Sequence, residues 1–230
     1  MSHCGGGRPW PLALLLAGLL AAAPAAAHEP AAVEDEYIKG VFTPAFVPPP
    51  PGSYELPVLG TVASFVLRDA DGRRVSTAAI MRGKAAVVSF VYTACSDRLG
   101  CPLASAVLRD VQQRLRAADL ADQAVLMTIS FDAARDTPAR LATYARALDA
   151  DPALWQFLAP SSPSTLDVLL RSYGQDRAPV YDERGRFTGR YRHVLKVFLV
   201  DPSAQIRNVY SAGFLVPQVL INDIKTVLAE

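Results

Sequence analysis

Three side chains, those of Cys95, Cys101 and His193, carry the most distinctive chemistry of this 230-residue chain. The cysteines lie in the segment YTACSDRLGCP with five residues between them, and the histidine lies in GRYRHVLKVFLVDP, much later in the chain. Two thiols can form a redox couple, bind a soft metal ion, or close a structural disulfide. An imidazole from a second segment completes a ligand set that soft or borderline metals accept. The spacing of the cysteines leaves all three roles open.

The spacing does restrict the local structure around the thiols. Residues six apart do not share a helix face, so both sulfurs can converge only if SDRLG is a loop. Pro102 suits the first position of a helix that would begin beside Cys101. Because a helix amino terminus favours negative charge, we expect the Cys101 thiol to ionise more readily than a free thiol.

Residues 1–27 have the pattern of a secretory signal peptide. An arginine precedes an apolar run that ends in Ala25-Ala26-Ala27, which predicts cleavage before His28 and export to the periplasm or beyond. The alternative is a retained membrane anchor, and only then do we expect contact with a membrane. Cleavage removes Arg8 but no acidic residue, so the formal charge of the remaining chain falls from +1 to zero. A neutral chain without a basic run argues against a nucleic-acid partner.

The rest of the chain divides into a tether and one domain. Residues 28–58 contain a short acidic patch and the run VPPPPG, which favours extended polyproline conformation over a packed core. We therefore expect a flexible tether over residues 28–58 and a globular domain over residues 59–230.

The order of predicted elements in the domain indicates an α/β fold. FVLRDADGRRV predicts a hairpin, KAAVVSFVY and AVLMTIS predict buried strands, and helical periodicity lies between those two strands. A strand, helix and strand in this order form a βαβ unit with parallel strands. Further helices are expected after Pro138, over about 164–173 and at the carboxyl end, and VLKVFLV and QIRNVYS predict a second antiparallel hairpin. The sum is a thioredoxin-like fold, a central mixed β-sheet flanked by helices.

Two acidic residues near the second buried strand have more than one interpretation. Asp132 and Asp136 in SFDAARDTP could act as catalytic carboxylates. The alternative is that Asp136 belongs to the cap of the helix that begins at Pro138, while Asp132 is a polar residue at a strand end near the thiols. We favour the second interpretation.

The sequence resembles the Sco/SenC family in five stretches: F-x-L-x-D-x-D-G, VVSFVYTAC, CP, SFDAARDTP and RHVLKVFLVDP. The resemblance spans about residues 59–228. It implies a thioredoxin-fold copper protein that helps to assemble the binuclear copper centre of cytochrome c oxidase. It also implies that Cys95, Cys101 and His193 bind one copper ion, either Cu(I) or Cu(II).

The sequence departs from the usual family pattern at both parts of this site. The family commonly has three residues between its cysteines, whereas this chain has five. The family's histidine commonly follows an aspartate, whereas His193 follows Arg192. A cation beside the imidazole should disfavour its protonation, and the missing carboxylate removes a group that could orient the ring.

These observations support three hypotheses. The first is an exported metallochaperone that passes copper to an oxidase subunit or to another copper or thiol client. The second is a thiol–disulfide oxidoreductase in which Cys95 and Cys101 form a catalytic redox pair and His193 is not needed as a ligand. The third is an interaction domain in which the two cysteines form a structural disulfide.

Overall fold

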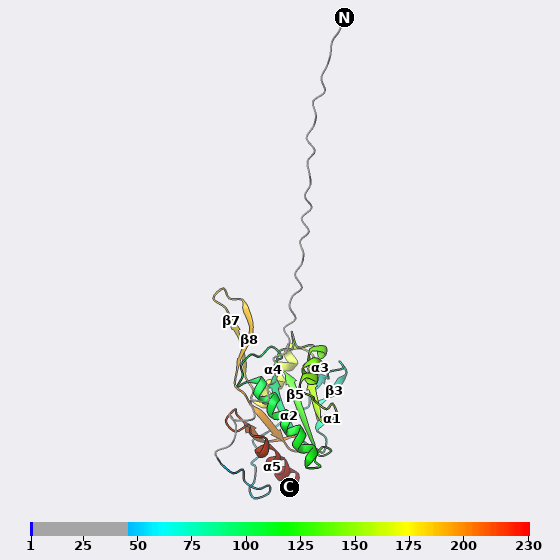
Figure 1. Ribbon diagram of the computed structural model, residues 1–230, viewed down its shortest axis with the longest axis vertical. Helices are drawn as coiled ribbons and strands as arrows, with labels where there is room; N and C mark the ends of the chain where they lie inside the picture. Colours follow the sequence, from blue (N-terminus) through cyan, green and yellow to red (C-terminus); the bar gives the residue numbers. More distant parts are fainter. Residues whose placement is uncertain (2–45) are drawn as a thin grey trace.

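The computed structural model describes Met1 and residues 46–230, so the predicted signal peptide and residues 28–45 of the predicted tether lie outside the described residues. The described part forms one α/β body from which a long hairpin projects (Figure 1). Its elements are, in chain order, β1 (Gly60–Thr61), β2 (Val66–Arg68), β3 (Arg74–Ser76), α1 (Thr77–Met81), β4 (Ala85–Val91), α2 (Cys101–Ala117), β5 (Ala124–Ser130), α3 (Pro138–Ala147), β6 (Trp155–Leu158), α4 (Pro163–Tyr173), β7 (Arg177–Tyr181), β8 (Phe187–His193), β9 (Val197–Val200), β10 (Gln205–Tyr210) and α5 (Pro217–Leu228).

A mixed six-stranded sheet forms the centre of the molecule. Its strand order is β1-β10-β9-β4-β5-β6, with β4, β5 and β6 parallel and β9 antiparallel to β4. Every residue of β4 and β5 is buried, as their apolar valine-rich sequences predict for strands covered on both faces. The predicted βαβ unit is β4, α2 and β5, and the thioredoxin-like fold class is confirmed.

Helices cover the sheet through their apolar stripes. α2 and α5 contact each other as well as the sheet, so they lie side by side on one face (Figure 1). Tyr173 of α4 packs edge-on against Phe90 of β4 and Phe198 of β9. No helix within residues 46–230 is long and apolar enough to cross a membrane.

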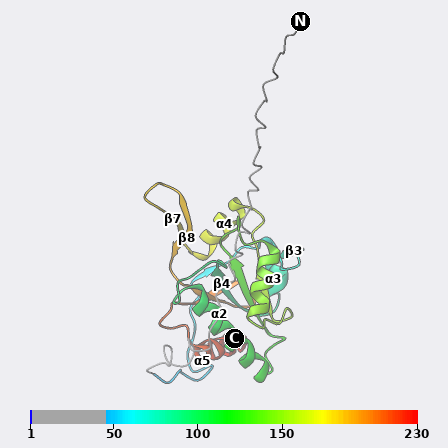
Figure 2. The same cartoon turned by 45° about the horizontal axis from the view of Figure 1, so that its top comes forward.

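Both predicted hairpins are present, but a third was missed. β2 pairs with β3, and β9 pairs with β10, both antiparallel as expected. β7 and β8 form a separate two-stranded antiparallel sheet that projects beyond the domain (Figure 2). Its strands are largely exposed and carry few apolar residues, so their alternation is weak, which is why the sequence pattern was not assigned to strands. His193 therefore ends a hairpin strand, just before the core strand β9 begins.

Part of the proline-rich segment before Leu59 contacts the domain. Asn222 of α5 donates to the Pro49 carbonyl at 2.8 Å, and the Gly52 amide donates to Thr226 Oγ1 at 3.0 Å. The Tyr54 hydroxyl donates to Asp223, and the Arg207 guanidinium donates to the Leu56 carbonyl. Residues 49–56 are thus held against α5 and strand β10.

Candidate metal centre

The two cysteines lie where the central strand β4 passes into helix α2. β4 ends at Val91, Cys95 follows within a turn, and Cys101 is the first residue of α2. Residues 96–100 are not helical, so the loop that convergence of the sulfurs requires is present. Pro102 occupies the first turn of the helix as expected, because its missing amide hydrogen would have no helical partner there.

The structure brings all three predicted ligands together. The sulfurs of Cys95 and Cys101 and a ring nitrogen of His193 all lie within 4.8 Å of one another. Cys101 Sγ lies 3.7 Å from His193 Nε2, and neither cysteine is in a disulfide. Both cysteines are buried, 4 % and 1 % exposed, and His193 is half-buried. Two sulfurs and one nitrogen at this separation form a set that a single soft metal ion could bind.

The His193 ring is held by contacts on several sides. It packs against Phe131 at a ring-centroid distance of 5.0 Å and edge-on against Tyr92 at 5.8 Å. Nδ1 lies 3.3 Å from the carbonyl oxygen of Tyr191. Since a carbonyl can only accept, Nδ1 carries the hydrogen of the neutral ring, and Nε2 is then the nitrogen that offers its lone pair toward the thiols. The Tyr191 carbonyl thus provides the orientation that a neighbouring carboxylate would otherwise give.

The two thiols differ in their protonation. A hydrogen bond from Cys101 and a weaker one from His193 outweigh burial and lower the pKa of Cys95 to about 4. Burial raises the pKa of the Cys101 thiol well above its ordinary value, and the neighbouring Cys95 raises it further. The expectation that Cys101 ionises readily at the helix terminus is therefore wrong, because complete burial outweighs the helix dipole.

The effect expected of Arg192 on the histidine is also wrong. Burial alone would lower the pKa of His193, but its hydrogen bonds to Cys95 and to the Tyr191 carbonyl outweigh burial and raise it. Arg192 precedes His193 in an extended strand, so its side chain points to the opposite face of the hairpin. The contact between Cys95 and the His193 ring therefore stabilises the charged form of each group.

Asp136 joins the cysteine segment to β5. Its carboxylate accepts from the Thr93 amide at 3.0 Å, the Thr93 hydroxyl at 2.5 Å and the Ser130 hydroxyl at 2.7 Å. The cap of α3 is Thr137, whose side chain accepts from the Arg140 amide, so the expectation that Asp136 caps this helix is wrong. Asp136 instead anchors the turn that leads to Cys95.

Arg135 attaches the β7–β8 hairpin to the domain. Its guanidinium pairs with Asp132, donates to the Gly189 carbonyl, and lies 5.1 Å from the centre of the Phe187 ring. Asp132 also accepts from the Tyr191 hydroxyl at 3.3 Å. We call Arg135, Asp132 and their contacts on Gly189 and Tyr191 the hairpin clamp.

Gly189 is required by the geometry of this clamp. Its φ of +82° favours glycine, and a Cβ there would overlap Nη1 of Arg135. The glycine and the alternating GRYRH pattern are the sequence signals that could have indicated the strand and its clamp.

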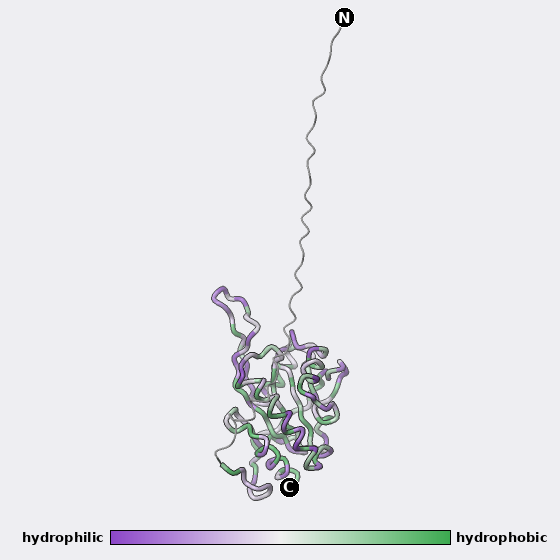
Figure 3. The backbone as a smooth tube through the Cα atoms, in the orientation of Figure 1, coloured by the Kyte–Doolittle hydropathy of each residue, from purple (hydrophilic) through white to green (hydrophobic). Residues whose placement is uncertain are grey.

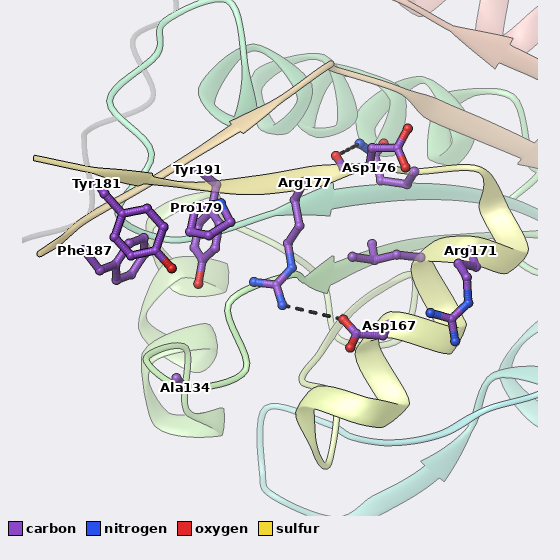
Figure 4. A pocket seen from close by; sticks show the side chains of 11 residues that line it. Ala134, Asp167, Arg171, Asp176, Arg177, Pro179, Tyr181, Phe187 and Tyr191 are labelled. Atoms are coloured by element: carbon purple, nitrogen blue, oxygen red, sulfur yellow. Dashed lines mark hydrogen bonds and ion pairs between the residues drawn. The ribbon is translucent and has the colours of Figure 1, made fainter. Parts of the chain in front are cut away.

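A groove lies along the inner face of the hairpin, between β7–β8 and α4 (Figure 4). Its volume is about 620 Å³, and Arg177 reaches across it to within 3.9 Å of Asp167. The guanidinium of Arg177 also lies over the Tyr191 ring at 4.9 Å. None of the three candidate ligands lines this groove, but Tyr191, whose carbonyl contacts His193, does.

The fold and the site define a thioredoxin-like protein with two thiols and an imidazole at the carboxyl end of its central strands. The sequence profile of the SCO1/SenC family matches residues 57–229. The chain therefore belongs to the SCO1/SenC family. A comparison with curated proteins finds no match.

Solved structures of the family share the fold. The chain is 25 % identical to Bradyrhizobium japonicum ScoI with copper bound, at a TM-score of 0.60, over 73 % of this chain and 99 % of that one. A SCO1/SenC family lipoprotein from Bacillus anthracis is 21 % identical, at a TM-score of 0.64, over 75 % and 98 %. BsSco, a member of the Sco family of cytochrome c oxidase assembly proteins in which a disulfide switch was identified, is 24 % identical, at a TM-score of 0.62, over 76 % and 97 %.

Proposed function

We propose that this protein is an exported metallochaperone that binds one copper ion through Cys95, Cys101 and His193. The observation that carries this proposal is the convergence of two sulfurs and the Nε2 side of a fixed imidazole within 4.8 Å. The copper-bound ScoI structure and the family membership support copper as the metal. Two thiolates and a neutral imidazole suit Cu(I), and the same set tolerates Cu(II).

The chemistry of loading follows from the protonation of the three groups. Cys95 is already a thiolate, whereas Cys101 must lose its proton and His193 must present an unprotonated Nε2. Binding therefore releases protons, and copper affinity falls as pH falls. Copper is the cargo, and its transfer to a client proceeds by exchange of these ligands for those of the client.

We propose that the client is a copper-receiving subunit of cytochrome c oxidase or another copper or thiol protein in the same compartment. The family membership supports the first of these. Export is supported by the signal pattern of residues 1–27 and by the lipoprotein among the structural relatives. A retained leader would tether the chain to a membrane.

The second candidate function is a thiol–disulfide oxidoreductase, and the unequal thiols favour it. The Cys95 thiolate would attack a client disulfide, form a mixed disulfide and release one client thiolate, which takes up a proton. Cys101, after losing its proton, would then attack the Cys95 sulfur and release the second client thiol. The client disulfide is reduced, and the Cys95–Cys101 pair is oxidised to a disulfide.

One experiment separates the two functions. The reduced protein receives one equivalent of copper, and retained metal is measured after desalting in wild type, Cys95→Ser, His193→Ala and the control Val194→Ala. Val194 is exposed and lies beside His193 without belonging to the ligand group. Copper that is retained by wild type and the control, lost from Cys95→Ser and held in a smaller amount by His193→Ala supports delivery.

A different result supports the oxidoreductase. In that result the wild type retains no copper but reduces a model disulfide rapidly, and His193→Ala keeps most of the disulfide-reducing activity. If the wild type does neither, both proposals are wrong and the thiols are structural.

A further inference from the structure

The β7–β8 hairpin stands out from the domain as a separate arm. It forms its own two-stranded sheet and projects past the rest of the described domain in both views (Figures 1 and 2). Its outer part is mostly hydrophilic, in contrast to the core strands (Figure 3). The foot of the arm carries His193, so a partner that docks at the foot lies close to the candidate metal centre.

The arm is held in place before any partner binds. The hairpin clamp ties Gly189 and Tyr191 to Arg135 and Asp132, and Arg177 at the foot of the arm stacks on Tyr191. A preorganised surface loses less conformational entropy on binding than a flexible one. The arm can therefore present a fixed pattern of charge.

The arm carries all the net charge of the described domain. Residues 177–193 contain five arginines and two acidic residues, a net charge of +3. The other described residues, 46–176 and 194–230, contain sixteen basic and sixteen acidic residues and are neutral. A charge confined to one hairpin of a neutral body produces a directed local field.

The arginines of β8 face away from the domain. Side chains alternate along a strand, and the less exposed residues Gly189, Tyr191 and His193 face inward. Arg190 and Arg192 therefore lie together on the outer face, where Ala178 of β7 is opposite Arg192. Neither arginine has a carboxylate partner within residues 46–230. We call Arg190, Arg192 and Ala178 the basic flank.

We propose that the basic flank is a docking surface for an acidic patch on a partner protein. Two exposed guanidinium groups on a fixed strand match the planar carboxylates of aspartate and glutamate. The small side chain of Ala178 leaves room for such carboxylates to approach both arginines. The flank lies on the strand that carries His193 but on its opposite face, so a partner that wraps around the foot of the arm can approach the candidate metal centre.

The distribution of charge favours a protein over an anionic membrane. The tip of the arm is the part that a flat surface would meet first, and it contains Asp182 and Glu183 beside Arg184 and Arg186, with no net charge. The arginines of the basic flank lie along the side of the arm, where a protein that wraps the hairpin reaches them more readily than a flat surface that meets the tip. The proposal that docking serves delivery rests on the proposed copper function, whereas the docking itself does not.

The test uses metal-free, reduced full-length protein, so it is independent of copper binding. A fluorescein-labelled peptide of alternating glutamate and glycine is titrated with the protein, and anisotropy is measured at about 20 mM and about 150 mM salt. We expect the glutamate peptide to bind and a matched glutamine peptide not to bind. Arg190→Glu should weaken binding about fivefold, and the higher salt should also weaken it.

The matched control is Arg74→Glu, which makes the same charge change on an exposed arginine of β3. It should change the affinity less than about twofold, because exposed charges beyond a Debye length are screened. Changes in backbone amide NMR chemical shifts on addition of the peptide should be largest in β7 and β8. Equal binding by Arg190→Glu and wild type, or binding to vesicles rich in phosphatidylserine but not to the peptide, would overturn the proposal.

Discussion

The Cys95 thiolate is the residue-scale feature on which the chemistry depends. Its pKa of about 4 against an ordinary value of 9.0 means that the metal-free site holds one thiolate and one protonated thiol over a wide pH range. Such a site is ready to bind a soft cation or to attack a disulfide without prior loss of the first proton. The two candidate functions, copper binding and disulfide exchange, both use the Cys95 thiolate.

We predict that His193→Ala raises the pKa of Cys95, because the imidazole hydrogen bond that stabilises the thiolate is lost. The shift should be partial, since the hydrogen bond from Cys101 contributes more and remains. The measurement is the ultraviolet absorbance of the thiolate as a function of pH in reduced protein. Val194→Ala serves as the control, and a titration curve that His193→Ala leaves unchanged would contradict the prediction.

The same shift predicts a dependence of stability on pH. Between about 4 and 9 the unfolded chain binds more protons at Cys95 than the folded chain does, so this residue's contribution to stability is complete above 9. The contribution is lost as pH falls toward 4. Urea unfolding of reduced wild type and Cys95→Ser should therefore give a stability difference that shrinks as pH falls. A difference that stays constant over this range would show that the Cys95 pKa is not lowered.

At the scale of elements, two anchors set the geometry of the site. Asp136 fixes the turn between β4 and Cys95, and the hairpin clamp fixes the strand that carries His193. Asp136 thus supports the cysteine segment, and the hairpin clamp supports His193. Asp132, Arg135 and Asp136 all lie in the SFDAARDTP segment, which supplies no candidate ligand but holds the two elements that do.

We predict that Asp136→Ala lowers the free energy of unfolding by about 2 kcal/mol, because three donors lose a buried acceptor. Thr137→Ala, which removes only the cap of α3, should cost about 1 kcal/mol. Urea unfolding measures both. If Asp136→Ala cost no more than Thr137→Ala, Asp136 would not be the anchor described above.

The hairpin clamp gives a prediction with a readout other than stability. Gly189→Ala displaces the Arg135 guanidinium and strains a backbone at φ of +82°, so β8 should open more often. Amide hydrogen exchange should accelerate in residues 187–193, and copper should be bound about tenfold more weakly because the imidazole loses its support. Gly185→Ala is a control, because its φ is also positive but a Cβ there meets no atom within 4 Å. Equal effects of the two substitutions would contradict the role of the clamp.

The sequence predicts the elements with strong apolar periodicity and misses those without it. β4, β5, α2 and the β9–β10 hairpin follow directly from their patterns, because burial on both faces leaves a continuous apolar run. The β7–β8 arm was missed because its stability comes from Arg135 and Gly189 rather than from its own apolar residues. Pairwise contacts between distant segments leave little trace in a single sequence.

The candidate metal centre was also predicted in part from the sequence. The residue types and the family resemblance pointed to Cys95, Cys101 and His193 as one group, and the structure places them together, but the direction predicted for the Cys101 and His193 pKa shifts was wrong. Those shifts depend on the burial of the thiol and on the contact between Cys95 and His193, which only the folded structure provides. The role of the Tyr191 carbonyl in orienting the imidazole is likewise evident only from the folded structure.

At the scale of the whole molecule, the contacts of residues 49–56 extend the domain at its amino-terminal side. Asp223 of α5 accepts from Tyr54, Asn208 and Tyr210, so it links this segment to the last strand. We predict that Asp223→Ala exposes residues 49–56 to limited proteolysis and lowers stability by about 2 kcal/mol. Lys225→Ala, at an exposed position of the same helix, should do neither. Unchanged proteolysis in Asp223→Ala would mean that the segment is held by other contacts.

The most direct test of the copper site is X-ray absorption at the copper edge of the loaded, reduced protein. We predict two sulfur ligands and one imidazole nitrogen per copper in the wild type, and loss of the imidazole signal with both sulfurs retained in the copper that His193→Ala still binds. A wild-type spectrum with fewer than two sulfurs, or one that His193→Ala leaves unchanged, would contradict the proposed metal centre.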